Sequence, residues 1–133
     1  MRPRVVLCGS LHRDAAGLKR LFRECEATGC RVLSPVSIDF DTGEFVKAAG
    51  EADLSSAEIE RFHLRAIRDA DFVLLHTPGG HVGTSASYEL GFAGALSKPV
   101  FAFQAPADEM LAGRVQTTTS VFEILEQLQL ISF

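Results

Sequence analysis

Short apolar segments alternate with amphipathic segments along this chain. Residues 4–8, 31–33, 71–76 and 99–103 are apolar runs, residues 114–117 form a weaker one, and segments with apolar residues at helical spacing separate them. Nearly continuous apolar strands are typical of a parallel sheet that is covered on both faces. The alternation therefore predicts an α/β fold: one doubly wound parallel sheet of about five strands, a flavodoxin-like or Rossmann-like three-layer sandwich.

Length and composition agree with one domain of this kind. The chain has 133 residues, of which 47% are hydrophobic and 23% charged, so we expect a single domain over residues 1–133. No apolar run approaches the 18 residues of a membrane span, and the first residues are too few and too mixed for a signal peptide. We therefore expect a cytoplasmic protein.

Charge and cysteine usage exclude further classes. The net charge is −4, which argues against sequence-independent binding to DNA or RNA. The three cysteines are an odd number without a C-x-x-C pair, so we expect reduced thiols rather than a disulfide framework or a zinc site.

Local signals mark where the helices begin. Ser55 and Glu58 have the spacing of a capping box, which predicts a helix from there to about residue 69. Residues 34–55 before it read as a long loop, with a helical turn around residues 44–49, and long loops in small domains are often functional. A glycine-rich loop at residues 77–84 precedes a helix expected over residues 85–96.

Ligands of doubly wound sheets bind beyond the carboxyl ends of the strands. Two segments follow such ends here, residues 9–13 and the glycine-rich loop, and we expect the site between them. Glycines let backbone amides approach a phosphate or a sugar, and the helix that follows adds the positive end of its dipole. The spacing matches neither the P-loop nor the dinucleotide-binding fingerprint, which argues against ATP hydrolysis and dinucleotide binding.

Glu89 and His63 are the candidate catalytic residues. Glu89 falls in the first turns of the helix after the glycine loop, where the dipole favours an ionised carboxylate and thus a nucleophile. The same place also suits a glutamate that only complements the dipole. His63 lies on the preceding helix, where it faces the site or serves as an ordinary surface or core histidine. His76 and His81 flank the glycine loop without the H-E-x-x-H pattern, so we expect no metal.

Several motifs resemble the nucleoside 2-deoxyribosyltransferase-like family, which includes the 2′-deoxynucleoside 5′-phosphate N-hydrolases. They are Ile-Arg-Asp-Ala-Asp-Phe-Val-Leu-Leu at 67–75, Tyr-Glu-Leu-Gly-Phe-Ala at 88–93, Lys-Pro-Val at 98–100 and the opening strand with its loop at 6–11. The resemblance leaves residues 35–55 and those after 106 unmatched.

The resemblance implies cleavage of an N-glycosidic bond in a nucleoside or nucleoside 5′-monophosphate, without a cofactor. Glu89 matches the family's glutamate nucleophile, which forms a glycosyl-enzyme ester that water or a second base resolves. Where the family often has an aspartate on the preceding helix, this chain has His63. Substrate contacts are expected at Gly9, Ser10, His12, Arg13, Asp71, Gly79, Gly80, His81 and Ser85. The loop within residues 39–50 is expected to cover the base.

Other interpretations stay open. Pro78-Gly79-Gly80 followed by Gly83-Thr84 also resembles the loop of cytokinin riboside phosphate phosphoribohydrolases, although the intervals from Gly80 to Gly83 and from Thr84 to Glu89 are longer here. A nucleotide-binding or signalling module without catalysis, and a protein-interaction domain, are the alternatives from other classes. The helix with Phe92, Ala93 and Leu96 has more apolar residues than one core face needs, which together with the resemblance predicts a homodimer or larger assembly.

Overall fold

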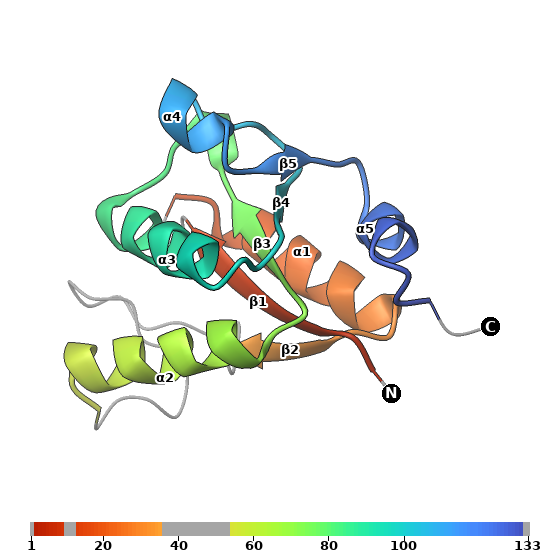
Figure 1. Ribbon diagram of the computed structural model, residues 1–133, viewed down its shortest axis with the longest axis horizontal. Coiled ribbons are helices and arrows are strands. Elements are labelled where there is room, and N and C mark those ends of the chain that lie inside the picture. The colour runs from red at the N-terminus through yellow and green to blue at the C-terminus, as the bar shows by residue number, and fades with distance from the viewer. Residues whose placement is uncertain (1, 10–12, 36–53, 132–133) are drawn as a thin grey trace.

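The computed structural model describes residues 2–9, 13–35 and 54–131. In this part of the chain a five-stranded, all-parallel sheet has the order β2-β1-β3-β4-β5, with helices on both faces (Figure 1). The predicted single-domain, doubly wound α/β fold is therefore confirmed. The strands are β1 (Arg4–Gly9), β2 (Arg31–Ser34), β3 (Phe72–His76), β4 (Val100–Ala102) and β5 (Gln116–Thr117). The helices are α1 (Ala15–Ala27), α2 (Ser56–Asp69), η1 (Pro78–Gly80), α3 (Thr84–Ala95), α4 (Glu109–Ala112) and α5 (Val121–Gln127).

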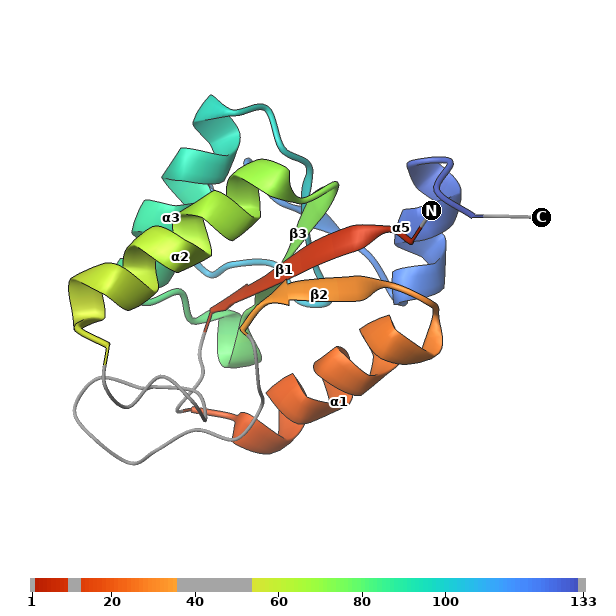
Figure 2. The same ribbon diagram turned by 90° about the horizontal axis from the view of Figure 1, so that it is seen from below.

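Alternate residues of the central strands pack into two separate cores. In β1, Val5 and Leu7 join the core beneath α1 and α5, whereas Val6 and Cys8 join the core beneath α2 and α3. Figure 2 shows the two helical layers on opposite sides of the sheet. Because each strand is buried on both faces, its sequence is almost continuously apolar, which explains the pattern that predicted a parallel sheet.

The switch in winding direction lies between β1 and β3. The chain passes from β1 outward to β2 and returns across β1 to β3, so these two central strands are neighbours. They are in register from Val5 opposite Phe72 to Gly9 opposite His76. Their carboxyl ends therefore lie side by side, at the position where folds of this class bind ligands.

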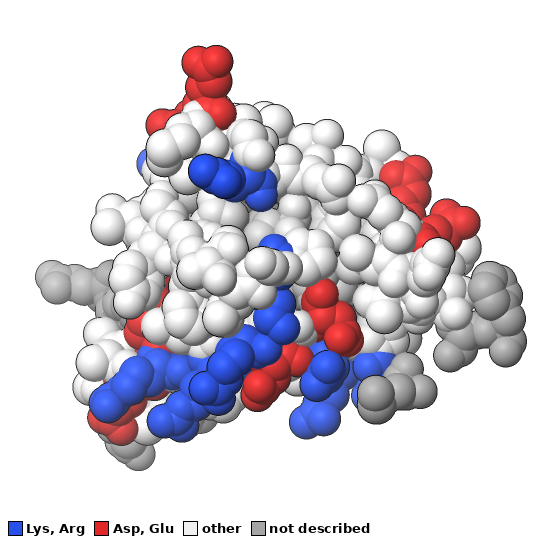
Figure 3. Space-filling view, in the orientation of Figure 1, with Lys and Arg blue, Asp and Glu red and all other residues white. Residues whose placement is uncertain are grey.

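Helix α2 is amphipathic, and its outer face is basic. The predicted capping box is present: Ser55 Oγ accepts from the Glu58 amide at 3.1 Å, and Glu58 Oε1 accepts from the Ser55 amide at 3.2 Å. Arg61, Arg65 and Arg68 are exposed, and Lys and Arg side chains line the edge of the molecule near α2 in Figure 3. The face that points inward carries the side chains of interest for function.

Some elements differ from expectation. Helix α4 was not predicted, because four residues are too few for a periodic signal. The helical turn expected at residues 44–49, and the cover over the base expected from the same loop, lie outside the described residues. None of the described helices is long and apolar enough to cross a membrane.

Candidate active site

Four side chains from four different elements meet near the carboxyl ends of β1 and β2, on the face covered by α2 and α3. His63 of α2 is at their centre. Its Nδ1 lies 2.6 Å from Ser34 Oγ of β2, and its Nε2 lies 3.3 Å from Cys8 Sγ of β1 and 3.4 Å from Glu89 Oε1 of α3. The structure thus brings together His63 and Glu89, the two residues that the sequence indicated as catalytic.

Glu89 is buried, which is unusual for a carboxylate. Only 7% of the residue is exposed, although its neighbour Tyr88 on the same helix is 62% exposed. It lies in the second turn of α3, so the amino-terminal end of the helix dipole is close and favours negative charge. The Glu89 carboxylate is therefore largely shielded from solvent and lies near the positive end of the α3 dipole.

The hydrogen bonds of His63 fix how its ring is oriented. A carboxylate only accepts hydrogen bonds, so Nε2 carries the proton that is directed at Glu89 Oε1. The opposite ring nitrogen, Nδ1, shares a short hydrogen bond with the hydroxyl of Ser34, a residue only 4% exposed. Ser34 therefore holds the imidazole so that its other nitrogen faces Glu89.

The surroundings shift the pKa values of two neighbouring carboxyl groups, Glu89 and Glu60, in opposite directions. Burial alone raises the pKa of Glu89, but the hydrogen bond and the charge of His63, with hydrogen bonds from Glu60 and Cys8, outweigh it and hold the pKa below its usual value. Burial, a hydrogen bond with Glu89 and repulsion by that carboxylate raise the pKa of Glu60 to about 7. At neutral pH Glu89 is therefore ionised beside a glutamate that still holds a proton in about half of the molecules.

Cys8 contributes a neutral thiol to this cluster. Burial raises its pKa well above the ordinary value, and the negative charges of Glu89 and Glu60 raise it further. Because the thiolate is the nucleophilic form of cysteine, Cys8 is unsuited to covalent catalysis. Its S–H group is instead a hydrogen-bond donor toward the Glu89 carboxylate.

The same cluster has the donor types of a metal site. Cys8, His63 and Glu89 each offer one ligand atom, and these atoms lie within 4.8 Å of one another. Sulfur, imidazole and carboxylate ligands of this kind suit Zn²⁺. However, an imidazole N–H and a thiol S–H directed at one carboxylate account for the contacts as hydrogen bonds. We therefore describe the group as an acid–base cluster and assign no metal to it.

The predicted glycine positions lie at tight backbone turns. Gly9 ends β1 with φ of +117°, and a Cβ there would collide with the carbonyl oxygen of His76 on β3. Gly80 has φ of +81° and is buried, and its carbonyl accepts from the Ala107 amide at 2.8 Å. Gly79 is exposed with φ of +64°. These residues let the backbone turn closely at the carboxyl ends of β1 and β3.

Other predicted substrate contacts lie just before or at the start of helices α1 and α3. Ser85 is exposed in the first turn of α3, His81 is partly buried just before that helix, and Arg13 is exposed just before α1. Ser10 and His12 lie outside the described residues.

Asp71 is not part of the cluster. It precedes β3, at the opposite end from Gly9 and His76, and its carboxylate accepts from the Arg4 amide at 2.7 Å and from the Arg4 guanidinium at 3.2 Å. The structure therefore separates Asp71 from Glu89 by the length of a strand and gives it a structural partner at the start of β1.

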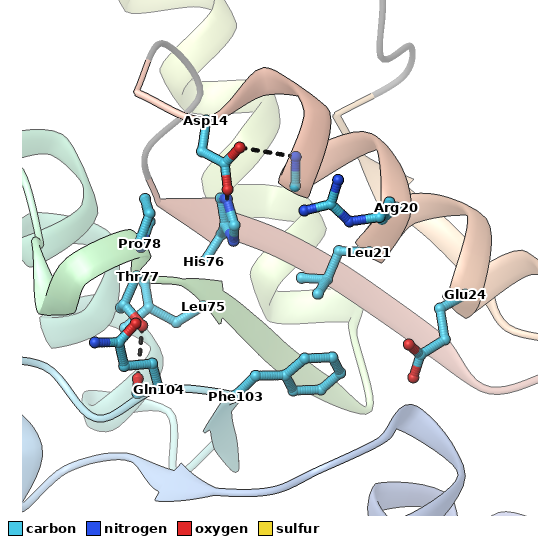
Figure 4. Close-up of a pocket in the computed structure, with 11 residues that line it drawn as sticks. Asp14, Arg20, Leu21, Glu24, Leu75, His76, Thr77, Pro78, Phe103 and Gln104 are labelled. Atoms are coloured by element: carbon cyan, nitrogen blue, oxygen red, sulfur yellow. Dashed lines mark hydrogen bonds and ion pairs between the residues drawn. The ribbon is translucent and has the colours of Figure 1, made fainter.

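A separate cavity of about 310 Å³ opens on the other face of the sheet, beside α1 (Figure 4). His76 points into it and faces Asp14, with His76 Nε2 and Asp14 Oδ2 3.4 Å apart. Arg20 and Phe103 also line this cavity. This cavity lies on the α1 side of the sheet, whereas the His63–Glu89 cluster lies on the α2 and α3 side.

Three members of the site, Cys8, Ser34 and Glu60, were not predicted. Ser34 was interpreted only as the first residue of the long loop but is the last residue of β2, and nothing local indicates that its hydroxyl meets a histidine 29 positions later. Glu60 had a usable signal, because it lies three residues before His63 and shares that face of α2.

Comparison with known proteins identifies the family. The model of the family described as "Nucleoside 2-deoxyribosyltransferase" matches residues 5–128, which is nearly the whole chain. The chain belongs to this family. The resemblance seen in the sequence is thereby confirmed, and an enzyme of the glycosidase or transferase kind that acts on nucleosides is indicated. No match was found among the curated proteins.

Solved structures support the same fold at low sequence identity. The Clostridium botulinum CMP N-glycosidase BcmB is 18% identical with a TM-score of 0.59, over 96% of this chain and 98% of that one. A conserved protein from Enterococcus faecalis V583 is 14% identical with a TM-score of 0.63, over 98% and 99% of the two chains. The 2-desoxiribosyltransferase from Leishmania mexicana is 15% identical with a TM-score of 0.49, over 78% and 67%.

Proposed function

We propose that this protein cleaves the N-glycosidic bond of a nucleoside or nucleoside 5′-monophosphate, with Glu89 as the nucleophile. The observation that carries the proposal is the buried, ionised Glu89 held by His63 in a chain of the nucleoside 2-deoxyribosyltransferase family. The fold shared with a CMP N-glycosidase supports a nucleotide as the substrate class.

The geometry suits a two-step reaction. One oxygen of Glu89 attacks the anomeric carbon as the bond to the base breaks, passing through an oxocarbenium-like transition state to a glycosyl ester. His63 orients the attacking carboxylate and stabilises its charge until the ester forms. Water or a second base then takes the sugar from Glu89 and regenerates the carboxylate.

The loops around the cluster supply the proposed substrate contacts. Gly9 and the glycine turn before α3 lie at adjoining strand ends, so their backbone amides suit a sugar or a phosphate. The proposed contact residues are Gly9, Ser10, His12, Arg13, Gly79, Gly80, His81 and Ser85. Asp71 is left out because it lies at the opposite edge of the sheet.

A homodimer formed through α2 and α3 is part of the proposal. Phe62 on α2, Tyr88 on α3 and Leu96 at the end of α3 are 43%, 62% and 40% exposed. Of the apolar residues expected to be surplus, Ala93 is buried in the core and Phe92 packs against it, so only Leu96 is exposed. We also propose a cytoplasmic location, with which the free, buried cysteines accord.

The test is release of free base, measured by chromatography from a panel of nucleosides and their 5′-monophosphates. Glu89→Gln keeps the size of the side chain but removes the nucleophile, so it is expected to abolish release while the protein stays folded. Glu126→Gln, an exposed glutamate on α5, is the matched control and is expected to retain full activity.

The outcomes separate the alternatives. Base exchange in the presence of a second free base identifies a transferase, and release into water alone identifies a hydrolase. Unchanged release by Glu89→Gln contradicts the assignment of the nucleophile. Nucleotide binding without any release by the folded wild type favours a binding module instead.

A further inference from the structure

Glu60 is a second carboxyl group in the site, and the reaction described above gives it no role. It lies on α2 three residues before His63, so both side chains emerge from the same face of the helix. Its Oε1 is buried, and no N–H or O–H group of the described residues reaches it. Its carboxyl group lies close enough to that of Glu89 for each of the two to shift the pKa of the other. Two carboxyl groups in such contact share one proton, because both cannot ionise together.

The surrounding donors decide which of the two carries the proton. The His63 ring nitrogen lies 3.4 Å from Glu89 and the Cys8 thiol is also directed at Glu89, so negative charge is stabilised there. Glu60 Oε1 lacks such a donor. The proton therefore resides on Glu60, and the raised pKa of Glu60 agrees with this.

The other titratable groups of the cluster are poorly suited to protonate a departing base. His63 is held between Ser34 and Glu89, and its Nε2 proton is already engaged by the nucleophile. Cys8 is a weak acid because burial raises the pKa of its thiol. Asp71 lies at the far end of β3.

We propose that Glu60 is the acid–base catalyst of this site, an inference that rests on the proposed N-glycosidic cleavage. In the first step, Glu60 transfers its proton to a nitrogen of the base while the bond from that nitrogen to the anomeric carbon breaks. Glu89 forms its ester with the carbon in the same step. In the second step, the Glu60 carboxylate takes a proton from water, the hydroxide oxygen bonds to the anomeric carbon, and the ester bond to Glu89 breaks. Both glutamates then return to their starting states.

The experiment compares two substrates that differ in their need for an acid. The probes are guanosine 5′-monophosphate and 7-methylguanosine 5′-monophosphate, in whichever sugar series the wild type cleaves. The methylated base already carries positive charge and leaves without being protonated. If only pyrimidine nucleotides are cleaved, the pair is uridine and 5-fluorouridine 5′-monophosphate, whose fluorinated base is the better leaving group.

Glu60→Gln is expected to lower kcat for the ordinary base by about 10²- to 10⁴-fold, the usual contribution of general acid–base catalysis. For the activated base we expect a clearly smaller loss. Glu89→Gln is expected to abolish both activities, and the control Glu126→Gln to change neither. Equal losses on the two substrates would show a merely structural role for Glu60 and overturn the inference, as would full activity of Glu60→Gln.

The pH–rate profile of the wild type provides a second test that needs no variant. A general acid must be protonated, so kcat for the ordinary base is expected to fall as pH rises through about 7, whereas the activated base should lack this limb. The titratable groups that face Glu60 are Glu89 of α3, His63 of α2 and Cys8 of β1, and they act on both substrates alike. Parallel profiles overturn the inference even if Glu60→Gln does not fold. If the wild type releases no base from any nucleotide, the proposed function is overturned and this inference with it. If the wild type is active and Glu60→Gln is equally active, the inference alone is overturned.

Discussion

Replacing Ser34 by alanine tests whether the hydroxyl of this buried residue holds the ring of His63 in place. The change removes a 2.6 Å hydrogen bond to His63 Nδ1 at a position that is only 4% exposed, so water cannot readily take the place of the lost partner. Leaving a buried polar group without its partner costs about 1–3 kcal/mol. For a chain of this length that corresponds to a fall in Tm of roughly 3–12 °C.

Activity is expected to fall more than substrate affinity. Once Nδ1 loses the hydroxyl, the ring is free to rotate or to change tautomer, and Nε2 then no longer orients the Glu89 carboxylate. If the same 1–3 kcal/mol is lost from the transition state, kcat falls about 5- to 150-fold, because each 1.4 kcal/mol corresponds to tenfold. KM should change little, since Ser34 acts through His63 and not on the substrate.

Thermal melting, steady-state base release and ¹⁵N NMR of the histidine ring nitrogens measure these effects. Ser56→Ala, at the exposed first residue of α2, is the matched control and should leave Tm, kcat and the His63 resonances unchanged. A Ser34→Ala protein with wild-type Tm and kcat would refute the reasoning. A fall in Tm with unchanged kcat would show that Ser34 stabilises the fold without serving the site.

Two further predictions concern the edges of the molecule. Asp71→Asn should destabilise the protein at neutral pH without changing KM. Hydrogen bonds from Arg4 outweigh the effect of burial and lower the pKa of Asp71. The stability that this carboxylate contributes is therefore present above about pH 4 and is lost as the pH falls below it. The urea midpoints of variant and wild type should therefore converge toward pH 3, and a gap that persists there would contradict this account. Sedimentation should show a dimer that Tyr88→Glu converts to monomer, since a charge at a buried contact is unfavourable; a monomeric wild type would exclude the proposed assembly.

The sequence predicted the fold well because the fold depends on local and periodic signals. The apolar runs became the four longer strands, and Ser55 caps α2 as its spacing to Glu58 indicated. The site was predicted only in part. Glu89 and His63 were found from the family motif and helix position, but the short contact between Ser34 and His63 depends on tertiary packing that brings β2 against α2.

Asp71 illustrates the opposite case, a residue that was expected among the substrate contacts with the resemblance but that the structure places away from the cluster. A parallel strand has two ends, and only the carboxyl end faces the ligand crevice. Asp71 precedes β3 and bonds to Arg4 at the start of β1, so its position along the strand excludes it from the cluster. Which end of its strand a polar residue occupies is therefore more informative than its charge.

The histidine at position 63 accords with the proposed role of Glu60 as the acid–base catalyst. Relatives that this chain resembles often have an aspartate there, and the proposed reaction needs a group that protonates the departing base. An imidazole fixed by Ser34 on one nitrogen and by Glu89 on the other cannot do so without releasing the nucleophile. It can instead hold Glu89 ionised, and an ionised Glu89 in turn keeps the proton on Glu60. In the proposed reaction the transferable proton thus belongs to residue 60, one helical turn before position 63 on α2.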